Sequence, residues 1–89
     1  MKIEIGCVQT DEELHLILAK ELGFPSFYGK NWDAFRDAIT GLVELPHEIE
    51  FIGCADIEKN LPKSFSHLRI CFQDLSQQYP SIGCKLIWS

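Results

Sequence analysis

The sequence predicts an α/β protein built on a small parallel sheet. Three short segments have the alternation or the apolar composition of β-strands, at residues 2–8, 48–52 and 84–88. Between each successive pair of strands lie two stretches with helical spacing, so each connection is long enough for a crossover. Because such crossovers join parallel strands and are nearly always right-handed, a parallel sheet packed with helices is the economical arrangement. The order of the strands does not follow from these arguments.

Length, composition and charge narrow the class of protein further. With 89 residues and 46% hydrophobic content, we expect a single domain over residues 1–89. Thirteen acidic residues against eight basic ones give a net charge of −5, which disfavours direct binding to nucleic acid or to an anionic membrane. This charge favours a basic partner instead. No apolar run approaches the ~20 residues of a membrane span, and no signal peptide is visible, so we expect a cytoplasmic protein.

The first strand and the first helix have clear boundaries. Residues 2–8 alternate between apolar and charged side chains, which indicates a strand. Thr10 and Glu13 have the spacing of a capping box and predict the start of a helix. Gly23 is placed to close that helix in a left-handed conformation, and Pro25 prevents its continuation. The apolar stripe of this helix consists of Leu14, Ile17, Leu18 and Leu22.

The second helix has two unlike sides. It is predicted to begin after Asn31, whose side-chain oxygen can accept a backbone N–H, and to end near Gly41. Its apolar side, which should anchor it, consists of Trp32, Phe35, Ile39, Leu42 and Val43. On its other side, polar residues follow one another at steps of four, three and four: Asp33, Asp37, Thr40 and Glu44. A heavily anchored helix that points a row of carboxylates outward indicates a display surface.

The second half of the chain repeats the strand and helix pattern. Pro46 breaks the chain before the strand at residues 48–52, and one or two helical turns can form over residues 55–61. After Pro62, a longer helix is predicted from about 63 to 78, with Phe65, Leu68, Phe72 and Leu75 on its apolar side. Residues 79–83 are expected to form a turn. The nearly unbroken apolar strand that follows suits a parallel sheet covered by helices.

The carboxylates of the second helix allow more than one interpretation. Asp33 and Asp37 could be an acid–base pair of the kind that glycosidases use, but a solvent-facing helix lacks the apolar pocket that such chemistry needs. Asp33 taken alone also has a structural explanation, since a carboxylate in the first helical turn is favourable and could pair with Arg36. Both roles stay open for Asp33. For the row as a whole we favour a complementary binding surface.

No catalytic nucleophile, metal site or phosphate loop is indicated. The three histidines are far apart in sequence, and the six glycines stand alone. Cys71 with His67 lacks a third orienting group and an oxyanion signature. The four cysteines contain no C-x-x-C pair, so we interpret them as thiols in a reducing compartment, and note that Cys7 and Cys54 both end predicted strands. We expect no enzyme activity, no cofactor and no metal.

Residues 28–41, with the sequence YGKNWDAFRDAITG, resemble the signature segment of the barstar family of intracellular ribonuclease inhibitors. The match continues in the first helix, in VELP at residues 43–46 and in the apolar strand near Ser89. The resemblance implies a three-stranded parallel sheet packed with four helices. It also implies a monomeric immunity-type inhibitor that binds one basic ribonuclease. In that family the second helix and the loop before it block the active site of a barnase-like ribonuclease, with acidic groups in place of RNA phosphates.

The resemblance assigns roles residue by residue. Asp37 would be the aspartate that enters the phosphate pocket of the enzyme, with Asp33 and Glu44 as flanking contacts. Asp74, on the long helix, would replace a family glutamate with another carboxylate. The remaining interface positions would be Phe27, Asn31, Arg36, Thr40, Gly41 and Leu42.

Several of these positions depart from the family pattern. Phe27 replaces a tyrosine, Lys30 replaces an acid, and Arg36 and Leu42 replace tryptophans. We therefore expect poor inhibition of barnase itself and tight inhibition of a related ribonuclease with an acidic or polar group opposite Arg36. The alternative is a non-inhibitory regulatory domain on the same scaffold that recognises another basic protein, since a fold does not fix a function.

Overall fold

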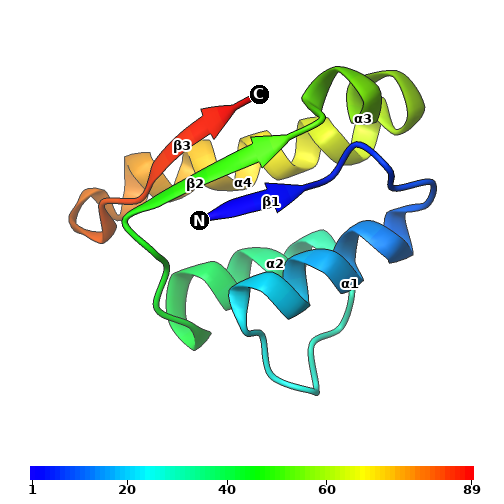
Figure 1. Ribbon diagram of the computed structural model, residues 1–89. Coiled ribbons are helices and arrows are strands. Elements are labelled where there is room, and N and C mark those ends of the chain that lie inside the picture. Colours follow the sequence, from blue (N-terminus) through cyan, green and yellow to red (C-terminus); the bar gives the residue numbers. More distant parts are fainter.

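The computed structural model describes all 89 residues and confirms the α/β class. Three parallel strands form one sheet in the order β1-β2-β3, which the sequence left undetermined. The strands are β1 (Lys2–Glu4), β2 (Glu48–Ile52) and β3 (Lys85–Trp88). The four α-helices are α1 (Asp11–Leu22), α2 (Trp32–Asp37), α3 (Cys54–Asn60) and α4 (Pro62–Gln78), with a π-helical turn η1 (Ala38–Leu42) and a 3-10 turn η2 (Pro80–Ile82) (Figure 1).

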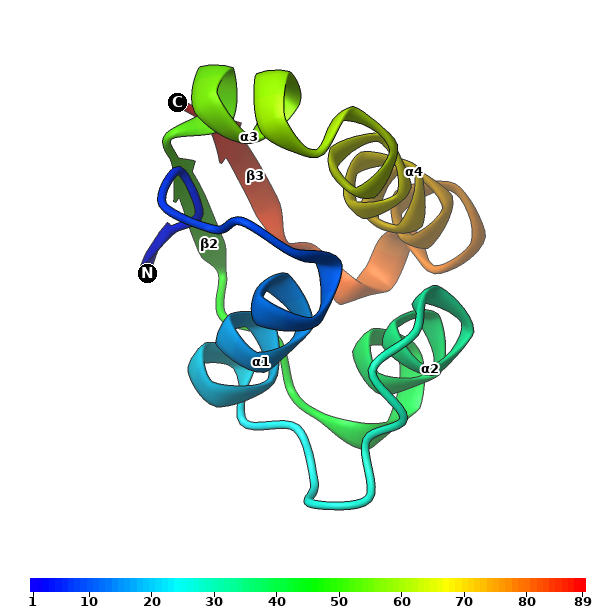
Figure 2. The same cartoon turned by 90° about the vertical axis from the view of Figure 1, so that its right-hand side faces the viewer.

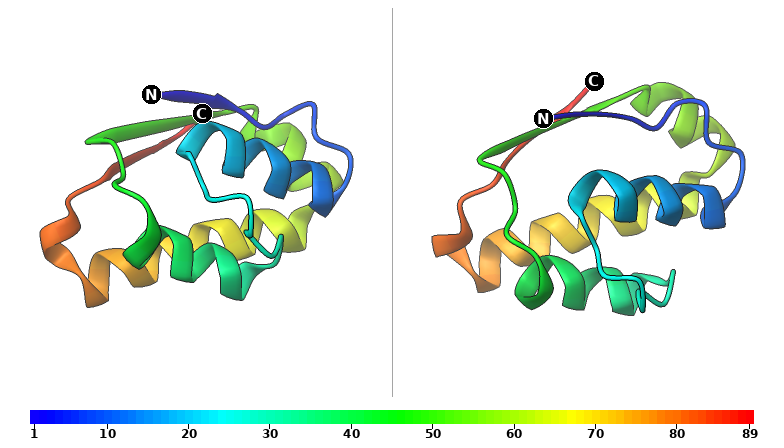
Figure 3. Two further views of the ribbon diagram at one scale, coloured as in Figure 1. Left: turned by 90° about the horizontal axis from the view of Figure 1, so that it is seen from below. Right: turned by 60° about the horizontal axis from the view of Figure 1, so that its bottom comes forward.

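The helices cover one face of the sheet. Figures 2 and 3 show α1, α2 and α4 on the same side of the strands, whereas α3 lies at the end to which the strands point. This follows from the strand order, because two right-handed crossovers that step in the same direction place their helices on the same face. Ile3, Ile49 and Phe51 point toward the helices and are buried, but Lys2 and Glu48 on the other face are exposed. The sheet is thus covered on one side only.

The outer strands differ from the expectation in detail. β1 ends at Glu4 instead of Val8, although the Ile5 N–H still donates to the Ile52 carbonyl over 2.9 Å. Beyond it, Gly6 passes so close to Gly53 that a Cβ atom added at Gly6 would lie 3.0 Å from the Gly53 Cα. This close approach leads the chain away from the sheet before a longer strand can form. β3 is only half-buried along Leu86, Ile87 and Trp88.

The predicted caps fix the helix ends. The Thr10 hydroxyl accepts from the Glu13 N–H at 3.1 Å, and Gly23 closes α1 with a φ of 74°. Asn31 Oδ1 accepts from the Ala34 N–H at 2.7 Å and so starts α2. These local signals confirm the predicted starts of α1 and α2 and the end of α1.

A connected set of aromatic rings joins α2 to the sheet through α4. Phe72 of α4 lies 5.7 Å from Phe35 of α2 and 5.9 Å from Phe51 of β2, measured between ring centroids. Phe51 in turn stacks on Trp88 of β3 at 4.9 Å. Phe35 and Phe51 are fully buried. The position of α2 therefore depends on Phe72, which touches both the helix and the sheet.

Candidate functional site

The acidic surface of the molecule lies on α2 and on the segment that follows it. We define it by three exposed carboxylates, Asp33, Asp37 and Glu44. None of them forms an ion pair within the chain, since the ion pairs involve other acids. Two large apolar side chains are also exposed in this part of the chain: Phe27, before the row, is 75% exposed, and Leu42, between Asp37 and Glu44, is 51% exposed. Carboxylates without an internal partner are available to cationic groups of another molecule, and the exposed apolar side chains near them can bury area in such a contact.

Leu42 is exposed because the helix widens near its end. The sequence placed Leu42 on the anchored side, and that prediction was wrong. The turn η1 (Ala38–Leu42) is π-helical, with the Val43 N–H donating to the Ala38 carbonyl over 3.2 Å. A turn with i→i+5 bonds holds more residues than an α-turn, so it displaces Leu42 from the apolar side. Ile39, which enters the same turn, is still buried as predicted.

A short helix carries most of this surface, and its neighbours hold it in place. α2 has six residues, fewer than a helix needs to be stable alone in water. Its Trp32 lies between two imidazoles, 4.5 Å from the His15 ring and stacked 5.8 Å from the His67 ring. Its Phe35 is buried in the core. These contacts reach α1 and α4, so the two longer helices fix the direction of the carboxylates.

The loop before α2 is tied to a buried histidine. The Tyr28 hydroxyl lies 2.5 Å from Nδ1 of His15, whose side chain is fully buried. Burial lowers the pKa of His15, and the nearby Asp11 carboxylate opposes this effect. With the imidazole neutral, Tyr28 donates to Nδ1, and Nε2 carries a proton that points toward Asp11 at a long 3.4 Å. Burial also raises the pKa of Tyr28, which keeps its hydroxyl protonated as a donor.

This polar chain continues into α4, because Asp11 also accepts from the Ser64 hydroxyl at 2.7 Å. The loop that presents Phe27 is thereby connected to α1 and α4 through Tyr28, the buried His15 and Ser64, and the exposed Asp11. Sequence reasoning gave His15 no specific role. The available signal was the placement of Asp11 one helical turn before it, which brings the two side chains to the same face of α1.

Arg36 joins α2 to α4. Its Nη1 lies 2.6 Å from Oδ2 of Asp74, an ion pair across 38 positions of the sequence. The local spacing had suggested a pair with Asp33, which does not form. Hydrogen bonding to Asp74 is the main cause that raises the pKa of Arg36. Asp74 is therefore already engaged within the chain, in contrast to Asp33, Asp37 and Glu44.

The remaining predicted residues have structural roles or line a hollow. Asn31 caps α2, and the Thr40 hydroxyl donates to the backbone carbonyls of Arg36 and Asp37, at 2.9 and 3.2 Å. Gly41 is exposed. A hollow of about 530 Å³ opens beside η1 and the segment that follows it, and its lining includes Thr40, Gly41, Leu42, Glu44, His47 and Ser81. This hollow adjoins the acidic surface and could receive a side chain from a partner.

The molecule offers few groups for other chemistry. No cluster of three or more His, Cys, Asp or Glu side chains is arranged to hold a metal ion. All four cysteines are free thiols; Cys7 is exposed and Cys54 is buried. None of the helices combines the length and the apolar character that crossing a membrane requires.

Comparison with known proteins bears on these features. The family model described as Barstar (barnase inhibitor) matches residues 1–87. The chain belongs to the Barstar family. A relative from Bacillus subtilis (strain 168), named "Putative ribonuclease inhibitor YrdF", is 51% identical over 35 residues. That match spans 39% of this chain and 38% of the relative.

Membership of the Barstar family confirms the resemblance seen in the sequence and the expected three-stranded sheet with four helices. It places the chain in a family of ribonuclease inhibitors. Which residues of this Barstar-family chain contact a ribonuclease stays a prediction, made above from the sequence. The geometry adds one distinction to that prediction. Among the four predicted acids, three have no ion-pair partner and one has Arg36.

Proposed function

We propose that this chain is a stoichiometric inhibitor of a basic, barnase-like ribonuclease and has no catalytic activity of its own. The observation that carries the proposal is the row of exposed, unpaired carboxylates Asp33, Asp37 and Glu44, on a helix that packs against the core and on the segment that follows it. A ribonuclease active site is built to bind phosphates with cationic side chains. Carboxylates at fixed positions satisfy the same donors, so the acidic surface would compete with RNA for them.

In this complex Asp37 is the central contact. It lies in the middle of the row, between Asp33 and Glu44 along the chain, and its carboxylate is free of internal partners. Phe27 and Leu42 would bury apolar area near these carboxylates and exclude water from the central charges. The hollow next to Glu44 would accept a side chain from the rim of the enzyme.

Arg36 influences which ribonuclease the chain binds tightly. A free cation in the middle of this surface would repel a basic partner, but the Asp74 carboxylate 2.6 Å away reduces that repulsion. The chain itself thus supplies the acid that we expected the partner to place opposite Arg36. Arg36 and Leu42 offer less aromatic area than a pair of tryptophans would, so tight binding requires an enzyme surface shaped for them. We expect barnase to fit poorly and a related ribonuclease to fit well.

The test is a titration of ribonuclease activity with the purified protein. Barnase and a set of related basic ribonucleases are each mixed with increasing amounts of the chain. The activity of one enzyme should fall linearly until one equivalent of the chain has been added. The Asp37→Ala variant should need a much larger molar excess for the same loss of activity. The association rate should fall as salt rises, because steering by exposed charges is screened well before about 0.5 M. Full activity of every enzyme at excess inhibitor would reject the proposal.

The alternative of a regulatory domain that binds another basic protein makes a different prediction. Such a domain needs net negative charge, but it has no requirement for carboxylates that imitate phosphates at one site. A competing RNA oligonucleotide distinguishes the two cases. It should displace an inhibitor from the enzyme and leave a regulatory complex unaffected.

A further inference from the structure

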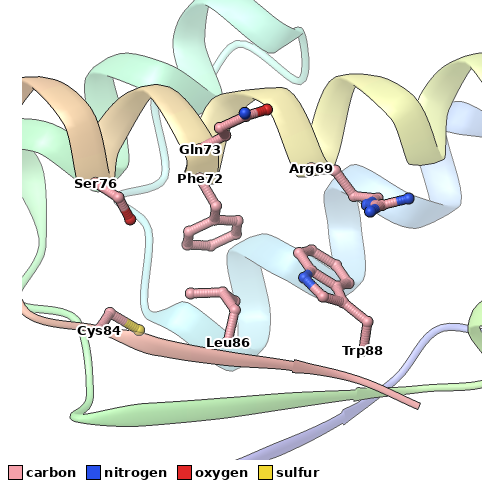
Figure 4. Close-up of a pocket in the computed structure, with 7 residues that line it drawn as sticks. All are labelled: Arg69, Phe72, Gln73, Ser76, Cys84, Leu86 and Trp88. Atoms are coloured by element: carbon pink, nitrogen blue, oxygen red, sulfur yellow. The ribbon is translucent and has the colours of Figure 1, made fainter.

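One groove of the molecule plays no part in the proposed inhibitor function. It lies between α4 and β3, and its lining residues are Arg69, Phe72, Gln73, Ser76, Cys84, Leu86 and Trp88 (Figure 4). Its volume is about 320 Å³. A smaller hollow of about 130 Å³ shares Phe72, Ser76, Cys84 and Leu86 with it and continues toward Tyr79 and Pro80. Together the two hollows follow β3.

The groove runs along an open edge of the sheet. β3 is the last strand in the order β1-β2-β3. On its inner edge the Lys85 N–H donates to the His47 carbonyl, just before β2, and the Ser89 N–H donates to the Phe51 carbonyl of β2, each over 2.8 Å. In a parallel strand, alternate residues direct their backbone groups to opposite edges. The N–H and C=O groups of Leu86 and Trp88 therefore point outward, where no further strand pairs with them.

Side chains next to this edge are incompletely covered. Figure 4 shows Phe72 extending from α4 toward Leu86, and Arg69 extending toward Trp88, with open space between the helix and the strand. Leu86 and Trp88 are both half-buried. An added strand would complete the coverage of these side chains.

The groove is cationic although the chain is acidic overall. The Arg69 guanidinium lies over two aromatic rings, 5.6 Å from the Phe65 centroid and 5.9 Å from the Trp88 centroid. It forms no ion pair, and no carboxylate lines the groove. Lys85 begins the strand beside it and is exposed. Glu58 lines a neighbouring hollow together with Arg69 but forms no ion pair with it. A cation held over aromatic rings without a paired acid can bind a carboxylate from another molecule.

The groove and the acidic surface lie on opposite sides of α4. Asp74 and His67 face α2, where they contact Arg36 and Trp32. Arg69 and Gln73 face the groove. Because these pairs lie about half a turn apart around the helix axis, one partner on each side can bind without the other in its way.

We propose that the edge of β3 and this groove form a docking site for an extended, acidic peptide segment of a partner protein. The segment would add a strand beside β3, with backbone hydrogen bonds to Leu86 and Trp88. It would place alternate side chains into the groove and a carboxylate at Arg69. In such complexes the backbone bonds give affinity and the side-chain pockets give specificity. A second copy of this chain fits less well. Pairing of two β3 edges would bring Arg69 and Lys85 of one copy close to the same two cations of the other copy, and these would repel one another.

The site can be tested by nuclear magnetic resonance with the ¹⁵N-labelled protein. The probe is a short synthetic peptide of alternating valine and threonine with one central glutamate, and the control peptide carries lysine at that place. The glutamate peptide should shift the amide signals of Leu86 and Trp88 in a saturable manner. The Arg69→Gln variant should bind it at least about tenfold more weakly, the size of a lost charge-assisted hydrogen bond.

Two matched variants control for general effects of charge. Lys63→Gln removes a cation of the same helix outside the groove, and Asp37→Ala changes the acidic surface; both should leave the affinity unchanged. Equal binding of the lysine peptide, shifts centred on α2, or no shifts at millimolar peptide would each overturn the proposal. Concentration-dependent dimers in sedimentation that shift the same two amides without peptide would also overturn it, because the occupant would then be a second copy.

Discussion

The helices α2 and α4 pack against each other, yet they keep their positions by opposite means. α4 has 17 residues and buries six of its own side chains along one stripe. α2 has six residues and buries only Phe35. The remaining contacts of α2 come from residues outside it. Asn31 caps its first turn, His15 and His67 pack against Trp32, and Asp74 forms an ion pair with Arg36. The helix with the unpaired carboxylates Asp33 and Asp37 thus takes much of its stability from its longer neighbour, whose own carboxylate, Asp74, is paired with Arg36.

Surface and scaffold are therefore separated in this small protein. A helix as short as α2 is not stable without its neighbours, so its side chains toward solvent contribute little to folding. Those side chains can change with the partner, while Phe35, Trp32 and their contacts must stay. Substitutions on the two helices should therefore fall into two groups, with effects on stability or on binding and rarely on both.

The largest expected effect is on stability, for the residue that joins the two helices to the sheet. Phe72→Ala removes a buried ring that touches Phe35, Phe51 and Trp88, and should lower the free energy of unfolding by about 3–5 kcal/mol. Urea denaturation followed by circular dichroism measures the change. Leu42→Ala, at an exposed leucine, should change it by less than about 0.5 kcal/mol. Equal effects of the two variants would contradict the division into scaffold and surface.

The next largest effect should appear in binding alone. Asp37→Ala should weaken the complex with the cognate ribonuclease by about 2–5 kcal/mol, because the cations around the carboxylate are left unpaired. That size is known from charge pairs in protein complexes, barnase–barstar among them, and only the ranking of Asp37 first is our inference. The unfolding free energy should stay unchanged. Calorimetric titration of Asp37→Ala, Asp33→Ala and Glu44→Ala ranks the three, and a larger loss for either of the other two would show that the roles are misassigned.

A smaller effect concerns pH and the loop before α2. Burial lowers the pKa of His15, so the folded protein binds fewer protons at this group than the unfolded chain does. Stability should therefore fall as pH drops below about 6.5, by at most about 1.4 kcal/mol per pH unit for one proton. Urea midpoints between pH 7 and pH 5 test this, with His15→Gln as the variant that lacks the titrating group. Parallel curves for the two proteins would assign the pH dependence to other groups.

The smallest effect belongs to the contact between the two helices at the surface. Arg36 and Asp74 are both partly exposed, with side-chain exposures of 44% and 32%, so solvent weakens their attraction. A double-mutant cycle with Arg36→Ala and Asp74→Ala should give a coupling energy below about 1 kcal/mol in stability. In binding, Asp74→Ala alone should weaken the ribonuclease complex, because it leaves Arg36 as an uncompensated cation. An unchanged or tighter complex would show that Arg36 does not face the enzyme.

Local signals in the sequence were sufficient for most of the elements. Thr10 and Asn31 accept the capping hydrogen bonds that their positions predicted, and Gly23 has its left-handed conformation. The long helix begins at Pro62, one residue before the predicted start, because proline is well suited to a first helical turn. Such features depend on residues a few positions apart, so periodicity and caps reveal them. The family signature carried the prediction of function.

Features that depend on distant parts of the chain were not predictable in this way. The pair of Arg36 and Asp74 joins residues that only the packing of α2 on α4 brings together. The strand order, and with it the open face of the sheet, follows from how the two crossovers step across the sheet. The π-helical turn has no signature in AITGL that we recognise, and it is the reason why Leu42 was assigned to the wrong side.

The π-helical turn has a consequence for how this molecule can change. Compared with a regular helix, such a turn accommodates one additional residue. Removal of one residue between Ala38 and Leu42 would restore the regular spacing and rotate the end of this helical segment by about 100° around the helix axis. Leu42 would then turn inward, and the carboxylate of Glu44 would leave its present direction. A deletion of one codon would therefore change the direction of the end of the acidic surface, although Asp33, Asp37 and Glu44 would all remain in the chain.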